Sequence, residues 1–125
     1  MRATAAVMIE PNQPLQIRQI EVDQPGPGEA RIRMAASGVC HSDLHTLDGT
    51  LEYVVLGHEG AGVVESVGPD VTNIRPGDHV MLSWVPYCGR CPSCTTGHPS
   101  LCEDLAWSDQ GTMRDGTVRF HADGQ

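Results

Sequence analysis

Four cysteines stand close together in the sequence and have the spacing of metal ligands. The pattern is C-x2-C-x2-C-x7-C, formed by Cys88, Cys91, Cys94 and Cys102. Four thiolates are the usual ligand set of a closed tetrahedral zinc site. Residues three apart in a tight turn can direct their sulfurs at one centre, and glycines and a proline between them permit such turns. The spacing therefore predicts a structural zinc site in a lobe of about residues 86–105.

Three other uses of these cysteines compete with zinc. Disulfides suit a secreted protein, but Met1–Gln13 has no apolar run typical of a signal peptide. Bacterial ferredoxins share the first three cysteines of the pattern, but their fourth follows after three residues and precedes proline. Here Cys102 follows after seven residues and precedes Glu103. Buried free thiols would need an apolar surround that this segment lacks. The pattern favours zinc and leaves the iron–sulfur cluster as the main alternative.

A second group of residues combines a thiol, imidazoles, a hydroxyl and carboxylates. Residues 40–45 read Cys-His-Ser-Asp-Leu-His, and residues 57–60 read Gly-His-Glu-Gly. Neither segment is a metal motif by itself, and each of Cys40 and His58 alone is more often a structural residue. Together they supply two of the three ligands of a Cys2His catalytic zinc site, which keeps a fourth position open.

Three side chains near Cys40 could serve such a site. Asp43 lies one helical turn after Cys40, and a ligating histidine such as His58 usually donates its other N–H to a carboxylate. Ser42 and His45 are three residues apart and are neighbours on a helix. A hydroxyl and an imidazole so placed could carry a proton from a buried alcohol to water.

The rest of the chain predicts short β-strands that position these residues. The expected strands are residues 2–9, 15–22, 30–36, 60–67 and 79–83. Alternation of apolar residues is clearest in 30–36, where it indicates one buried face. Turns are predicted at residues 24–28 and 75–78, and a hairpin turn at Asp115-Gly116. The one expected helix is Ser42–Leu47, with Ser42 as a possible N-cap.

Composition and charge narrow the classes of function. The chain has 125 residues, which suits one domain, and its net charge is −8. It has no Lys, and all eight basic residues are Arg, so a Walker-A phosphate loop is excluded. An acidic chain without a basic patch is a poor ligand for nucleic acid or anionic membranes. We therefore expect a cytoplasmic protein with no nucleic-acid or membrane partner.

On these motifs the chain resembles the zinc-dependent medium-chain alcohol dehydrogenases. The segments that carry the resemblance are Gly38–Asp43, Gly57–Val64, Pro76–Val80, Cys88–Cys94 and Cys102. The resemblance implies a mainly β fold, a chaperonin-10 (GroES)-like β-barrel with a protruding structural-zinc lobe. In the family this barrel packs against a Rossmann domain that binds the nicotinamide cofactor.

The resemblance also implies roles for single residues. It makes Cys40 and His58 ligands of the catalytic zinc, Glu59 a residue that approaches that metal, Ser42 and His45 a proton relay, Asp43 the partner of His58, and His41 a contact of the cofactor pyrophosphate. The complete enzyme would bind structural and catalytic zinc, use NAD or NADP, act on a small alcohol or aldehyde, and form homo-oligomers.

Two features depart from the family pattern. The interval between Cys40 and His58 is short, and residues 49–56 lack a Pro-rich stretch. In the family this loop borders the substrate cleft, so the sequence does not identify the substrate. The sequence contains no G-x-G-x-x-G and stops at Gln125, before a third cysteine or histidine ligand for the catalytic zinc. We therefore expect residues 1–125 to be a partial catalytic domain without its Rossmann domain, inactive by itself.

Two other interpretations remain. A stand-alone zinc-binding GroES-like interaction module would share the fold without enzymatic activity. A relative of the zinc-free quinone reductases would share the barrel but not the four-cysteine lobe. The order of Cys40, Ser42, His45 and His58-Glu59 favours the dehydrogenase.

Overall fold

The computed structural model describes residues 1–49, 54–83, 86–104 and 112–122. The chain divides into two compact units. The first consists of Met1–Leu82 and Arg119–Gln125, and the second of Ser83–Val118. The first unit contains the β-sheets, and the second contains the four closely spaced cysteines.

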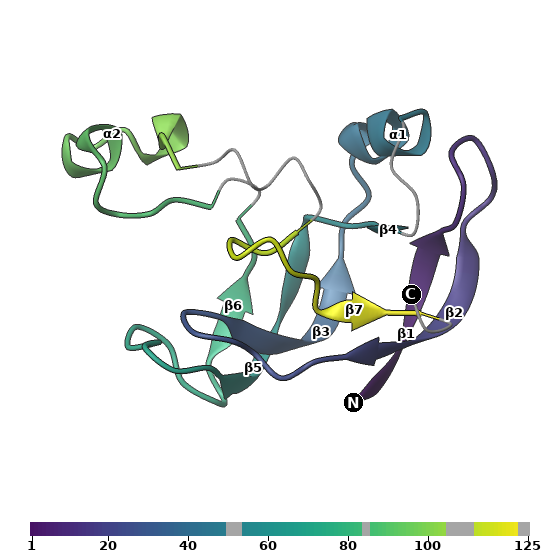
Figure 1. The fold of residues 1–125 in the computed structure, drawn as a ribbon, viewed down its shortest axis with the longest axis horizontal. Coiled ribbons are helices and arrows are strands. Elements are labelled where there is room, and N and C mark those ends of the chain that lie inside the picture. Colours follow the sequence, from purple (N-terminus) through teal and green to yellow (C-terminus); the bar gives the residue numbers. More distant parts are fainter. Residues whose placement is uncertain (50–53, 84–85, 105–111, 123–125) are drawn as a thin grey trace. The chain divides into compact units, whose positions relative to one another are not determined.

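A four-stranded antiparallel sheet in the first unit has the order β4-β1-β2-β7 (Figure 1). Its strands are β1 (Arg2–Met8), β2 (Gln16–Val22), β4 (Val54–Val55) and β7 (Phe120–His121). β1 and β2 pair along their length, from Arg2 opposite Glu21 to Val7 opposite Gln16. The sheet therefore joins the start of the chain to a strand near its other end.

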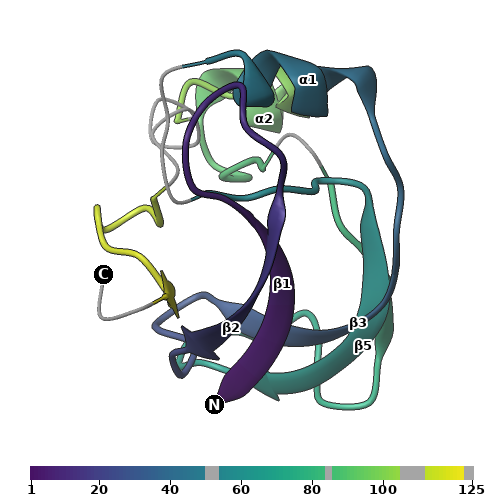
Figure 2. The same cartoon turned by 90° about the vertical axis from the view of Figure 1, so that its right-hand side faces the viewer.

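A three-stranded antiparallel sheet has the order β3-β5-β6. Its strands are β3 (Ala30–Ser37), β5 (Gly60–Val67) and β6 (His79–Met81). β3 and β5 run side by side and curve together (Figure 2), and their register shifts twice along the pairing. Such irregularities bend a strand and increase its twist, which is how a short sheet curls. The same pairing brings the end of β3 next to the start of β5, Ser37 opposite Gly60.

The core of the first unit is small and aliphatic. Its most buried side chains are Val7 and Met8 of β1, Ile20 of β2 and Val64 of β5, each at most 4% exposed. Full burial of a side chain of this size contributes about 1.5–3 kcal/mol each. The core thus draws on both sheets, and none of the described polar side chains is fully buried.

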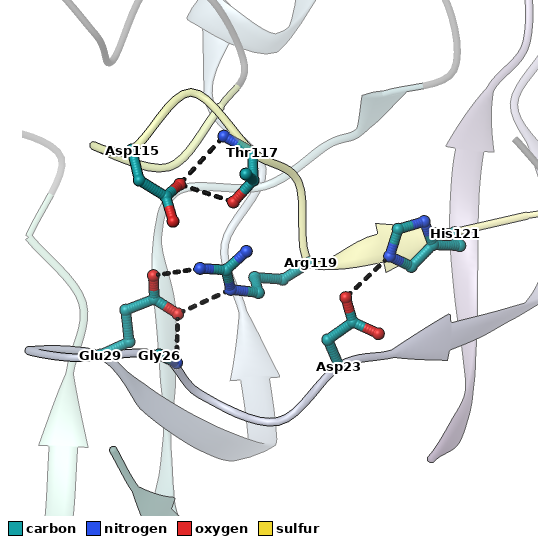
Figure 3. A network of polar contacts seen from close by, with 7 residues as sticks. All are labelled: Asp23, Gly26, Glu29, Asp115, Thr117, Arg119 and His121. Atoms are coloured by element: carbon teal, nitrogen blue, oxygen red, sulfur yellow. Dashed lines mark hydrogen bonds and ion pairs between the residues drawn. The ribbon is translucent and has the colours of Figure 1, made fainter. Parts of the chain in front are cut away.

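A partly buried ion pair links β7 to the turn between β2 and β3 (Figure 3). Arg119 Nε and Nη2 donate to the two carboxylate oxygens of Glu29, both at 2.9 Å. The backbone N–H of Gly26 donates to the same carboxylate at 2.8 Å. His121 Nε2 lies 2.9 Å from Asp23 Oδ2, beside the pairing of β7 with β2. These contacts hold the last described strand in the first unit.

The second unit consists of loops with two short helices. α2 (Pro92–Thr95) begins after Cys91 with proline at its start, and a 3-10 helix, η1 (Pro99–Leu101), follows. Asp104 lies 3.1 Å from Arg114 and 3.7 Å from Arg90. Cys102 is the one fully buried apolar residue among those described in this unit.

The mainly β prediction is confirmed, with three local corrections. The helix α1 runs His41–Leu47, and its N-cap is Cys40 rather than Ser42. Cys40 fits the position because the Asp43 side chain accepts a hydrogen bond from its backbone N–H. The short strand β4 was not expected from the sequence.

The third correction concerns the predicted hairpin. Met113 N–H donates to Thr117 O, so a tight turn does form around Asp115-Gly116. The strand that follows, β7, pairs with β2, and the described residues directly before the turn, 112–114, belong to no strand. Residues 50–53, within the short interval noted between Cys40 and His58, lie outside the described residues.

Within the part of the chain that the structure describes, no helix has the length and apolar character needed to cross a bilayer.

Candidate metal centres

The four cysteines of the second unit converge on one point. One Sγ atom from each of Cys88, Cys91, Cys94 and Cys102, which we call the thiolate centre, lies within 4.8 Å of all the others. The Sγ atoms of Cys88 and Cys94 are 4.0 Å apart. A tetrahedral zinc site with Zn–S bonds of about 2.3 Å requires sulfurs about 3.8 Å apart. None of the four is in a disulfide. The donor set and its spacing fit a zinc ion.

Backbone N–H groups point at the sulfurs of the thiolate centre. Cys88 Sγ accepts from the N–H of Arg90 at 3.5 Å and of Cys91 at 3.3 Å. Gly89, which lies between Cys88 and Arg90, has φ of 73°. This is in the left-handed region, which lets the loop fold back on the Cys88 sulfur. Cys102 Sγ accepts from the N–H of Cys88 and of Asp104, both at 3.4 Å. Such donors favour the charged thiolate over the thiol.

The acidities of these thiols differ widely. N–H donation from Arg90 and then from Cys91 lowers the pKa of Cys88 to about 6. The pKa of Cys91 is also lowered, first by the N–H of Glu103. Burial, followed by the neighbouring Cys91, raises the pKa of Cys94 to about 12. A bound cation is the group that would let all four sulfurs be charged together.

A second group of donor atoms lies in the first unit. Cys40, His58 and Glu59, which we call the Cys40 centre, each place one ligand atom within 4.8 Å of the others. Cys40 follows β3 and caps α1, whereas His58 and Glu59 precede β5. The N–H of Gly38 donates to Glu59 O at 2.8 Å and ties the two segments together. The antiparallel pairing of β3 with β5 therefore assembles residues that are distant in sequence.

Asp43 connects two members of the Cys40 centre. Its Oδ2 accepts from the backbone N–H of Cys40 at 3.0 Å, and its Oδ1 lies 3.4 Å from His58 Nδ1. The side chains of Asp43 and His58 are only 15% and 18% exposed. A carboxylate at Nδ1 leaves Nε2 as the ring nitrogen available to a metal. The structure thus brings Asp43 to His58, the partner that the family resemblance implied for it.

Ser42, His45 and His41 were also predicted as site residues, and their surroundings in the structure differ. Ser42 Oγ lies 3.0 Å from His58 Nε2, so the hydroxyl adjoins the nitrogen that faces the centre. The ring of His45 packs edge-on against that of His41, with centroids 5.4 Å apart. Among the described residues, Ser42 and His45 form no hydrogen bond with each other. Both histidines are exposed on α1.

The closeness of Gly38 to Glu59 is not predicted by the sequence. Gly38 begins a motif in the sequence, whereas in the structure it directly adjoins the Glu59 side chain. No local pattern indicates this contact, because it depends on the register of β3 with β5.

Comparison with known proteins agrees with the fold. Residues 26–122 match the family profile described as the alcohol dehydrogenase GroES-like domain. The NDMA-dependent alcohol dehydrogenase of Amycolatopsis methanolica is 47% identical over 127 aligned positions, which cover 99% of this chain and 34% of that protein. The chain spans about a third of the length of the curated relatives that it matches.

Solved structures show the same relationship. An alcohol dehydrogenase zinc-binding domain protein from Burkholderia ambifaria superposes with a TM-score of 0.91 at 38% identity, over 98% of this chain and 34% of that one. A thermostable alcohol dehydrogenase from Pyrobaculum aerophilum, described as cobalt and zinc bound, superposes with a TM-score of 0.77 at 32% identity. The superposition covers 97% of this chain and 38% of that one. The predicted mainly β, GroES-like fold is therefore confirmed, and the chain belongs to the alcohol dehydrogenase GroES-like domain family.

Proposed function

We propose that this chain is the zinc-binding catalytic domain of an alcohol dehydrogenase. In the complete enzyme, a hydride would pass between a small alcohol or aldehyde and NAD or NADP. The observation that carries the proposal is the Cys40 centre, where a thiolate, an imidazole and a carboxylate meet beside a hydroxyl. An interaction module built on the thiolate centre alone has no need of this second group.

The two centres would have different tasks. The thiolate centre has four protein ligands and fits a structural zinc, which stabilises a unit with little apolar core of its own. The Cys40 centre has fewer ligands and leaves coordination positions for water or substrate. When bound there, zinc would supply Lewis acidity to the oxygen of the alcohol or carbonyl.

The chain's own residues would orient that site and move the proton. Asp43 holds Cys40 and His58 in place through its two oxygens. Ser42 Oγ lies next to His58 Nε2 and is the first acceptor for the alcohol proton. His45, exposed on the same helix, would pass that proton to water, and His41 would contact the cofactor pyrophosphate. Glu59 is a third ligand that can approach or leave the metal.

The setting of the complete enzyme follows from the same proposal. The five cysteines are free, which suits the reducing cytoplasm. The net charge of −8 disfavours a nucleic-acid partner. Assembly into homo-oligomers is supported only by the resemblance to the family.

Replacing Ser42 tests the catalytic part of the proposal. In a full-length protein that carries this domain, Ser42→Ala should lower turnover of an alcohol with NAD or NADP by about 10²–10⁴-fold, because the proton loses its first acceptor. Thr46→Ala, on the same helix and outside the Cys40 centre, is the control. Unchanged turnover of Ser42→Ala, with a substrate isotope effect showing that hydride transfer limits the rate, would remove Ser42 from the mechanism.

A further inference from the structure

The carboxylate of Glu59 lies where a side chain on Gly38 would be. A Cβ atom on Gly38 would collide with Glu59 Oε2 and would lie 3.1 Å from Glu59 Cβ and 3.3 Å from Glu59 Cδ. These are the three nearest atoms, and all belong to the Glu59 side chain. The space above Gly38 is therefore occupied by this one carboxylate-bearing side chain.

The backbone does not explain why this position is glycine. Gly38 is not among the described residues with positive φ, so an L-residue could adopt its conformation. Its N–H donates to Glu59 O at 2.8 Å, a hydrogen bond that alanine would also make. What alanine would lack is the room for the Glu59 side chain.

We infer that Gly38 is a positioning residue for the Cys40 centre. Its missing side chain lets the Glu59 carboxylate rest against the end of β3, within 4.8 Å of the ligand atoms of Cys40 and His58. Glu59 is exposed. This inference rests on the proposed role of Glu59 as a metal ligand.

A methyl group at Gly38 would displace the carboxylate rather than the fold. Glu59 Oε2 is the far end of a flexible side chain, which can rotate away at small cost. None of the three atoms nearest to the added Cβ belongs to Cys40, His58 or Asp43, so these residues should keep their positions. Gly38→Ala should therefore remove the third ligand selectively and should resemble Glu59→Ala.

The test is metal affinity of the 125-residue chain in a double-mutant cycle. The thiolate centre is first loaded with zinc, and Co²⁺ is then titrated into the Cys40 centre and followed by its visible absorption. Gly38→Ala should weaken Co²⁺ binding roughly tenfold, within the range for residues that position a ligand. In a Glu59→Ala background, Gly38→Ala should have no further effect.

Gly60→Ala is the matched control. The three atoms nearest to a Cβ atom there, apart from those of its chain neighbours, belong to the Met34 and Leu82 side chains. It should lower thermal stability and leave Co²⁺ affinity unchanged. If Gly38→Ala does not fold, the Gly38→Ala, Glu59→Ala variant must fold, because two of the three nearest atoms, Glu59 Oε2 and Cδ, are then gone.

The outcomes separate this inference from the proposed function. If the parent chain binds Co²⁺ at the Cys40 centre but Gly38→Ala binds equally well, the positioning role is wrong and the metal site stands. Equal weakening by Gly38→Ala with and without Glu59 shows a purely structural role and also overturns it. If neither the 125-residue chain nor a full-length protein that carries this domain binds a second metal ion, the proposed function itself fails and the inference fails with it.

Discussion

At the scale of single residues, Asp43 has the most consequential position. Its carboxylate accepts a hydrogen bond from the backbone N–H of Cys40 and contacts the ring Nδ1 of His58. It therefore couples the orientations of these two ligands. The geometry also fixes which imidazole nitrogen faces the centre, since Nδ1 is turned toward the carboxylate. The family resemblance implied the pairing with His58, but the hydrogen bond to the N–H of Cys40 became visible only in the structure.

Removal of this carboxylate should weaken metal binding without unfolding the chain. Asp43→Ala should lower the Co²⁺ affinity of the Cys40 centre by about 10–100-fold, because His58 loses its orienting partner. Asp48→Ala, at the exposed end of the same helix, is the control. Equal affinities of these two variants, measured by Co²⁺ titration, would show that Asp43 has no orienting role.

The thiols of the thiolate centre should differ in reactivity when no metal is bound. The pKa of Cys88 is lowered to about 6, so at pH 7 it is mostly thiolate. The pKa of Cys94 is raised to about 12, so at the same pH it is almost entirely thiol. Since the thiolate is the nucleophile, iodoacetamide should label Cys88 before Cys94 while the second unit keeps its fold. Peptide mass spectrometry of a sample alkylated briefly, directly after a chelator has removed the metal, measures the order, and preferential labelling of Cys94 would contradict it.

At the scale of elements, the strands were predictable and their partners were not. Alternation of apolar residues over 30–36 predicts β3, and the strand expected at 60–67 is β5. The buried face expected of β3 is not observed, because none of its residues is buried in the structure. The N-cap was misassigned because a hydroxyl is the commoner cap, whereas here Ser42 faces His58 and Asp43 serves Cys40. Pairing between distant segments leaves no local pattern, so β7 beside β2 could not be foreseen.

The Arg119–Glu29 ion pair should stabilise the first unit measurably. Both side chains are largely shielded, at 19% and 15% exposure, and the pair makes two hydrogen bonds. Arg119→Met should lower the free energy of unfolding by about 1–3 kcal/mol, because Glu29 keeps its charge and loses its cation. Arg2→Met removes an exposed ion pair with Glu21, with a distance of 3.8 Å, and should change the free energy of unfolding by less than about 0.5 kcal/mol. Urea unfolding of the zinc-loaded variants measures both free energies of unfolding. Equal losses in the two variants would show that the shielded ion pair stabilises the chain no more than the exposed one.

At the scale of the whole molecule, the two units are stabilised differently. The first buries aliphatic side chains from two sheets. The second has Cys102 as its one fully buried apolar residue among those described, so its thiolate centre replaces a core. The four-cysteine spacing made this centre predictable from sequence, because all its ligands lie in one short loop. The Cys40 centre depends on strand register, so the sequence alone could only suggest it.

The central claim is that the chain has two metal centres of unequal strength. The thiolate centre has four thiolates in one loop, whereas the Cys40 centre has three ligands, one of them the exposed Glu59. Zinc should therefore bind tightly at the first and more weakly, by orders of magnitude, at the second.

Zinc titration of the 125-residue chain against chelators of graded affinity is the most direct test. We expect one tight zinc per chain, lost in Cys91→Ser, and one weaker zinc, lost in Cys40→Ser while the tight one remains. Two sites of equal affinity would contradict this account, as would iron and a brown colour in protein purified without added metal.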